Sequence, residues 1–268
     1  MNRLLTLIKR YPLMAFFTLS YAISWPAWHL EAKGITWASF PGYFGPAIAA
    51  IIIVAITQGR SALEDLFARI FRWRIPFRVY LGATLLPAVI ILSVIPIRII
   101  FGQTTAFDAS SLISLLPRLV LLLVSGTLYG TLIVAGEEIG WRGYALPELL
   151  QGHKPLTASL TVGIWWGFWH IPLIWLFYSN QFNWINALLY ALGFLAASVF
   201  YTWLYLHSSG SVLIASLFHS VYDIVAMLAG GLPGNLFSFR THMLVWVVAA
   251  LILVALLGWL HRETRVNL

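Results

Sequence analysis

The 268-residue sequence contains no cysteine and very few charged residues. The lack of cysteine excludes disulfide bonds, zinc–thiolate centres and cysteine catalysis. Charged residues make up 9% of the chain and hydrophobic residues 60%, and the mean hydropathy is +0.87. A soluble domain carries roughly 25% charged residues. The composition therefore predicts an all-α, polytopic membrane helix bundle, with no soluble domain appended.

Eight apolar stretches are predicted to be membrane-spanning helices. They cover, approximately, residues 13–29, 43–57, 80–97, 113–135, 156–178, 184–206, 212–229 and 243–260. Loop lysines and arginines explain the net charge of +7, without nucleic acid as a partner. Twelve of the 16 such residues fall in the N-terminal, 58–78, 137–155 and C-terminal segments. We therefore expect both termini of this multi-pass protein to face the cytoplasm.

The segment 58–78, after the second span, carries five arginines. Its apolar residues recur at helical spacing and are Leu63, Leu66, Phe67, Ile70 and Phe71. This pattern predicts an amphipathic helix that lies on the membrane surface. We divide the chain into an N-terminal region of three spans plus interfacial helices (1–114), a core of spans four to seven (115–230), and a C-terminal span with a short basic tail (231–268).

Two adjacent acids, Glu137 and Glu138, follow a run without charge at 119–135. A carboxylate at the edge of a membrane helix is costly to place, so it marks a candidate functional site. Arg142 lies four residues after Glu138, so the two side chains share a helix face and can pair. Glu137 is rotated by about 100° from Glu138. The spacing predicts that Glu138 is held by Arg142 and that Glu137 remains available.

Three further ionisable residues lie deep in apolar sequence. His170 is followed closely by Pro172, which predicts a kink beside the histidine. His219 and Asp223 are four residues apart, so Asp223 can accept a hydrogen bond from the imidazole and orient it. A single histidine in a membrane is more often an interhelical hydrogen-bonding residue than a catalyst. Six such residues on three helices instead predict a shared polar cavity, because exposing them to lipid is costly.

The tryptophans divide into two predicted groups. Trp165, Trp166 and Trp169 lie near His170 in the sequence, and we expect them to wall the cavity. Trp166 and Trp169 are also expected to contact substrate. Residues near span ends are predicted to form the interfacial belt, namely Trp25, Trp28, Trp175 and Trp184. Histidines at predicted span ends or loops receive no role, namely His29, His153, His207, His242 and His261.

The clustered residues are consistent with two kinds of chemistry. An ionised Glu137 with a neutral His170 can activate water by general-base catalysis, while His219 donates a hydrogen bond to the oxyanion of amide hydrolysis. Alternatively, Glu137, His170 and His219 are three ligands of a divalent metal such as zinc. An H-E-x-x-H motif is absent, so the common zinc-protease helix is excluded. The sequence leaves the metal-free and the metal-assisted mechanisms open.

Three motifs resemble the signature of the CPBP family, the CAAX prenyl protease type II and bacteriocin-processing (Abi) membrane proteins. They are the Glu137-Glu138-x-x-x-Arg142 stretch, the Trp166-x-x-x-His170 stretch and the His219-x-x-x-Asp223 stretch. The family usually has Phe at the position of Trp166 and Asn at that of Asp223. The resemblance covers roughly residues 115–230.

The resemblance implies an intramembrane endopeptidase whose site opens to the cytosolic leaflet. It assigns Glu137 and His170 to activation of water, and His219 and position 223 to the oxyanion. It assigns Glu138 and Arg142 to shaping the site. Because an ionised Asp223 would repel an oxyanion, we expect Asp223 to orient His219 instead.

The expected partners are the lipid bilayer and a membrane-bound peptide or protein substrate, in a prokaryotic plasma membrane. One alternative is a non-enzymatic immunity or scaffold protein that uses the polar cluster for assembly. Another is an ion or proton transporter with the same buried groups. The sequence shows no inverted repeat of broken helices, a pattern that many transporters have.

Overall fold

A computed structural model of the chain describes residues 3–103, 109–178, 183–230 and 238–258. Within these ranges the chain is helical and contains no strand, so the predicted all-α architecture is confirmed. The elements are α1 (Arg3–Arg10), α2 (Pro12–Ala32), η1 (Thr36–Ala38), α3 (Ser39–Thr57), α4 (Arg60–Ile70), α5 (Phe77–Leu92), α6 (Val94–Ile100), α7 (Ala109–Gly140), the π-helical segment η2 (Trp141–Ala145), α8 (Leu146–Leu150), α9 (Pro155–Trp169), α10 (Ile171–Tyr178), α11 (Trp184–His207), α12 (Val212–Gly230) and α13 (Phe239–Leu257).

Six helical stretches in the described residues are long and apolar enough to cross a membrane. They cover residues 36–57, 77–100, 120–150, 184–207, 212–230 and 239–257. This confirms a helical membrane bundle. The other two predicted spans correspond to α2 and to the pair α9 and α10. The total of eight spans stays a prediction.

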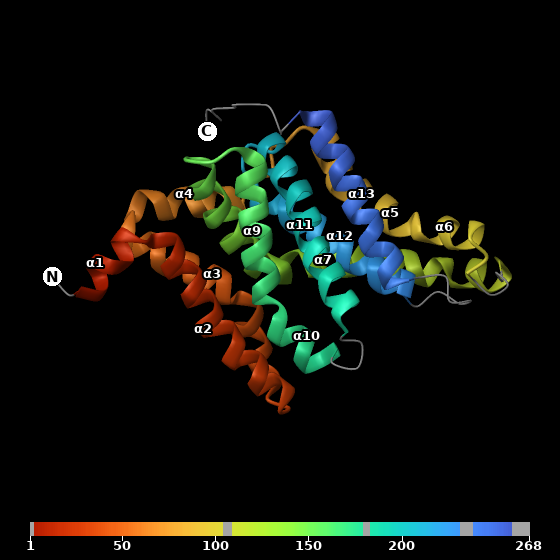
Figure 1. Cartoon of the computed structure of the whole chain (residues 1–268), viewed down its shortest axis with the longest axis horizontal. Helices are drawn as coiled ribbons and strands as arrows, with labels where there is room; N and C mark the ends of the chain where they lie inside the picture. Colours follow the sequence, from red (N-terminus) through yellow and green to blue (C-terminus); the bar gives the residue numbers. More distant parts are fainter. Residues whose placement is uncertain (1–2, 104–108, 179–182, 231–237, 259–268) are drawn as a thin grey trace.

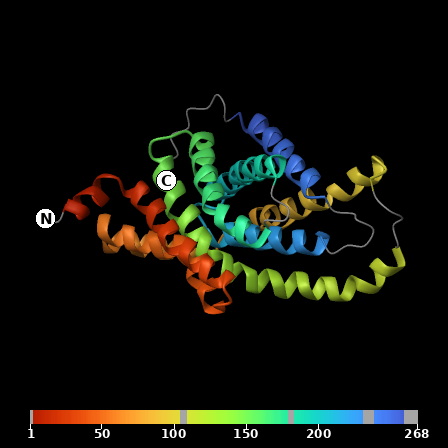
Figure 2. The ribbon, with the colours of Figure 1, turned by 60° about the horizontal axis from the view of Figure 1, so that its bottom comes forward.

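Helix α7 is the longest helix among the described residues. It runs along one side of the molecule (Figure 2) and packs against α3 and α12. Helices α2 and α3 lie at one end of the molecule, and α5, α6 and α13 lie at its other end (Figure 1). Helix α11 packs against both α9 and α13. The predicted boundary between residues 114 and 115 falls inside α7, and the three-part division stays a prediction.

The predicted kink beside His170 is confirmed. Helix α9 ends at Trp169 and α10 begins at Ile171, so His170 lies at the break. Two side chains from α2 bind carbonyls of α9: the Tyr21 hydroxyl donates to the carbonyl of Trp165 at 2.6 Å, and the Trp25 indole donates to that of Trp169 at 3.1 Å. These bonds fix α9 where the regular helix ends.

The prediction that Trp28 is a belt residue is wrong. Its side chain is fully buried, with ring centroids 4.4 Å from Trp169 and 6.0 Å from Tyr43. Trp175 and Trp184 are 62% and 88% exposed, which suits an interfacial position. Composition marks a tryptophan as amphipathic, but only helix packing determines which rings are covered.

The helix that carries the two acids widens immediately after them. Residues Trp141–Ala145 form a π-helical segment, and the Leu146 N–H bonds to the Trp141 carbonyl. Such segments are rare and occur often at functional sites. The regular α-helix is therefore interrupted before Pro147.

The segment after the second span is helical from Arg60 to Ile70, as predicted. Leu66 is buried, whereas Phe67 and Phe71 are 43% and 74% exposed. Its position on the membrane surface stays a prediction. The predicted basic tail, residues 259–268, lies outside the described residues.

The close approach of α3 and α7 generates a prediction about Gly140. A Cβ atom at Gly140 would lie 2.7 Å from the backbone carbonyl of Pro46, a distance that requires the backbone to shift. We expect Gly140→Ala to lower the free energy of unfolding by about 1–3 kcal/mol, measured by thermal unfolding in detergent. Gly152→Ala is the control, because nothing lies within 4 Å of the added Cβ. Equal unfolding temperatures for the two variants would contradict this packing.

Candidate active site

Glu137, Glu138 and Arg142 lie at the end of α7 and in η2, and all three are buried. The Arg142 Nη1 donates to both Glu138 oxygens, at 2.9 and 3.0 Å. The predicted pair between Glu138 and Arg142 is therefore present. An unpaired charge in this position would carry a large desolvation penalty, so each residue stabilises the other.

Arg142 also lies between two aromatic rings. Its guanidinium carbon is 3.6 Å from the ring centroid of Tyr201 and 4.3 Å from that of Trp166. These are cation–π contacts, which gain strength when water is excluded. Tyr201 received no role from the sequence, because no spacing rule connects a residue of α11 with one in η2.

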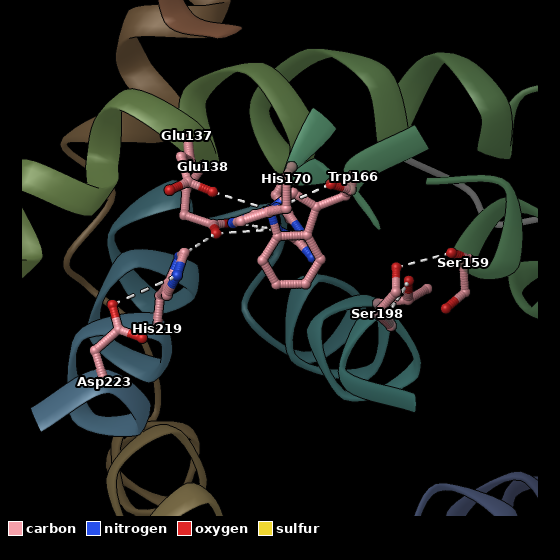
Figure 3. A network of polar contacts seen from close by, with 10 residues as sticks. Glu137, Glu138, Ser159, Trp166, His170, Ser198, His219 and Asp223 are labelled. Atoms are coloured by element: carbon pink, nitrogen blue, oxygen red, sulfur yellow. Dashed lines mark hydrogen bonds and ion pairs between the residues drawn. The ribbon is translucent and has the colours of Figure 1, made fainter. Parts of the chain in front are cut away.

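Glu137 is free of the arginine pair, as predicted, and has a different partner. The Trp166 indole N–H donates to Glu137 Oε2 at 2.9 Å (Figure 3). The sequence predicted Trp166 as a wall residue, and the structure adds this donor role. A phenylalanine, the usual residue of the resembled family, has no such donor.

His170 is positioned by the break between α9 and α10. Its Nδ1 lies 2.9 Å from the carbonyl oxygen of Trp166. Because a carbonyl only accepts, this bond assigns the proton to Nδ1 and leaves Nε2 as an acceptor. A neutral histidine of this tautomer can receive a proton at Nε2.

His219 lies between two carboxylates (Figure 3). Its Nδ1 is 2.8 Å from Glu138 Oε1, whereas its Nε2 is 3.7 Å from Asp223 Oδ2. Hydrogen bonds of this kind are shorter than about 3.2 Å. The hydrogen bond that orients His219, which the sequence analysis expected from Asp223, is therefore made by Glu138. Asp223 is half exposed and lies farther from His219.

Several of these side chains line a cavity of about 250 Å³. Its polar lining includes His170, His219 and Asp223. Its other lining residues are mostly apolar or aromatic, namely Trp166, Leu173, Ile174, Tyr190, Gly193, Phe194, Ala197, Tyr201, Phe218, Tyr222, Met243 and Trp246. Glu137 is not a lining residue, but it accepts a hydrogen bond from Trp166, which is one. The arrangement gives a mostly apolar chamber whose lining includes three ionisable side chains.

Trp165 and Trp169 differ from the sequence prediction, because neither lines this cavity. The Trp169 side chain is fully buried. Its ring centroid lies 4.4 Å from that of Trp28 and 5.9 Å from that of Trp141. Trp169 therefore joins α9 to α2 and η2 by packing.

His242, which received no role from the sequence, supports the cavity. It is buried in α13, and its Nε2 accepts a hydrogen bond from the Trp246 indole at 2.8 Å. Trp246 lines the chamber. The four-residue spacing of His242 and Trp246 was a usable signal, but the predicted span began after His242 and concealed it.

The described residues do not form the metal site that the sequence left open as one of two alternatives. No group of three or more histidine, aspartate or glutamate side chains in the described ranges comes together in a way that could hold a metal ion. One oxygen of Glu137 is bonded to an indole N–H, and Nδ1 of His219 faces Glu138. Glu137, His170 and His219 are therefore not identified as a metal-binding group in the described part of the chain.

Comparison with known proteins identifies relatives for most of the chain. Residues 112–225 match the family model described as Type II CAAX prenyl endopeptidase Rce1-like. This range contains all six predicted polar residues. The chain is also 31% identical to CAAX prenyl protease 2 of Methanococcus maripaludis, over 80% of this chain and 79% of the relative.

The buried pair generates a prediction about Glu138. Glu138→Gln leaves the fully buried Arg142 without its anionic partner, and we expect the free energy of unfolding to fall by about 3–5 kcal/mol. The matched control is Glu64→Gln, which removes the exposed pair with Arg60; such pairs contribute about 0.3–0.5 kcal/mol. The measurement is thermal unfolding in detergent. A Glu138→Gln variant as stable as Glu64→Gln would show that the pair of Glu138 with Arg142 does not stabilise the fold.

Proposed function

Because the chain belongs to the Rce1-like type II CAAX prenyl endopeptidase family, we propose that it hydrolyses its substrate with a water activated by Glu137 and His170. Membership makes the protein an intramembrane protease of the CAAX prenyl endopeptidase type. The observation that carries the mechanism is the unequal environment of the adjacent acids. Glu138 is occupied by Arg142 and His219, whereas Glu137 is bonded only through Oε2 to Trp166 among the contacts given above.

In the proposed reaction, Glu137 accepts a proton from water as the water oxygen attacks the carbonyl carbon. The Nε2 of His170 is the second acceptor available to orient this water. General-base catalysis of this kind contributes about 10²–10⁴-fold. The proton taken from water then moves to the departing amine when the C–N bond breaks, so that the Glu137 carboxylate is restored.

The tetrahedral intermediate carries an oxyanion, and we assign its stabilisation to His219. We assign His219 the protonated form: its Nδ1–H donates to the Glu138 carboxylate, and its second N–H, at Nε2, is available to the cavity. An N–H placed in advance near developing negative charge is an effective catalytic group. Glu138 then orients His219, and Arg142 neutralises Glu138.

The proposed substrate is a membrane-associated protein with an apolar or prenylated C-terminal segment. The names of the related proteins support the prenylated class. The apolar lining around His170 and His219 is compatible with apolar side chains next to the cleaved bond. The charge distribution supports the proposal that both termini and the site face the cytoplasm.

Loss of Glu137 tests the proposed base. We expect Glu137→Gln to lower kcat on a fluorogenic prenylated peptide by about 10²-fold or more, because the amide keeps the indole contact but cannot accept the proton. His170→Ala is expected to lower kcat as well. Glu64→Gln and His153→Ala are controls, since both residues are exposed and lie outside the cavity.

Turnover by Glu137→Gln at the wild-type rate would contradict the assignment of the base. If no variant and no wild-type protein cleaves the probe, the non-enzymatic alternative gains support. Preserved cellular function of Glu137→Gln would support it further.

Treatment with a chelator tests the absence of a metal step. Because no group of three or more histidine, aspartate or glutamate side chains in the described residues could hold a metal ion, we expect dialysis against EDTA to leave turnover of the prenylated peptide unchanged. The metal content of the active protein is measured in parallel by elemental analysis. Loss of activity that added Zn²⁺ restores would contradict the proposed mechanism.

A further inference from the structure

The basic segment after the second span contacts the helix that carries the two acids. We call residues 60–72 the α4 arm. The Nη1 of Arg69 in this arm donates to the backbone carbonyl of Gly143 in η2, at 3.1 Å. Four residues later stands Pro147, which has no N–H. The ordinary helical bond to the Gly143 carbonyl therefore cannot form, and Arg69 supplies a donor to it.

The same arm also packs directly against Gly143. A Cβ atom at Gly143 would lie 2.9 Å from Leu66 Cδ1 and 3.2 Å from Val212 Cγ2. Leu66 and Val212 are both buried. A side chain at position 143 would therefore require Leu66 to shift, where the α4 arm, η2 and the first turn of α12 meet.

A second set of bonds joins the arm to the turn before α12. Arg72 donates to the carbonyl of Ser209, and the Ser211 hydroxyl donates to the carbonyl of Arg72 at 2.7 Å. The Ser211 hydroxyl also accepts from the Ile214 N–H at 3.3 Å. Ser211 therefore caps the start of α12, the helix that carries His219, while it is bound to the arm.

We propose that Arg69 is a positioning residue, which holds η2 and the start of α12 in register so that Glu138 meets His219. The two site residues come from different helices, and their contact is 2.8 Å long. A shift of about 1 Å in such a geometry can cost about 10²-fold in rate. The effect on turnover rests on the function proposed above, whereas the coupling between the arm and η2 does not.

The test replaces Arg69 by methionine, which retains an unbranched stem but loses every donor. Arg60→Met is the matched control, because Arg60 lies on the same helix, is exposed and binds Glu64. We expect Arg69→Met to lower kcat about tenfold with KM little changed, and Arg69→Lys to recover most of this loss, because an ammonium also donates to a carbonyl. Because kcat is expressed per folded molecule, a variant that merely impairs folding would keep the wild-type kcat on this scale.

Hydrogen exchange measured by mass spectrometry supplies a readout that does not depend on activity. We expect faster amide exchange within residues 141–150 and 208–219 in Arg69→Met, and wild-type exchange there in Arg60→Met. If the wild-type protein cleaves no probe, the proposed function fails, and exchange alone still decides the coupling. Unchanged exchange in these two segments, or a kcat equal to that of Arg60→Met, would overturn the proposal.

Discussion

The buried contact of Arg142 with Glu138 is the interaction on which the rest of the site depends. Both side chains have no solvent exposure, and Glu138 also contacts His219 from another helix. Removing two charges from water is costly, and the cost is offset only when good geometry and further hydrogen bonds are present. Here Nη1 reaches both carboxylate oxygens, and two aromatic rings flank the guanidinium. Through these contacts, residues of η2, α9, α11 and α12 surround the pair of Arg142 with Glu138.

The same constraint gives two adjacent acids different environments. Glu138 points to a cation and an imidazole, whereas Glu137 points to an indole N–H. Their one-residue separation places them on different faces of α7. The break at His170 then places a histidine beside the indole that holds Glu137. A structural acid and a proposed catalytic acid can therefore be consecutive in the sequence without competing for a partner.

Local features of the site were predictable from the sequence, and contacts between distant segments were not. The pair of Glu138 with Arg142 follows from helical spacing, and the break at His170 follows from Pro172. The contact of His219 with Glu138 joins residues 81 positions apart, so a spacing rule favoured Asp223 instead. The covered rings of Trp28 and Trp169 and the burial of His242 likewise depend on which helices meet. The bundle itself was predictable because composition alone excludes a soluble domain.

The central claim is that Glu137 activates water and does not itself attack the substrate. The most direct measurement is a single turnover in ¹⁸O-water, with mass spectrometry of the product and of the peptide that contains Glu137. Attack by water predicts one ¹⁸O atom in the new carboxyl group of every product molecule and an unlabelled Glu137. Product without label, together with ¹⁸O in the Glu137 side chain, would instead show a covalent acyl intermediate on Glu137 and would contradict the account.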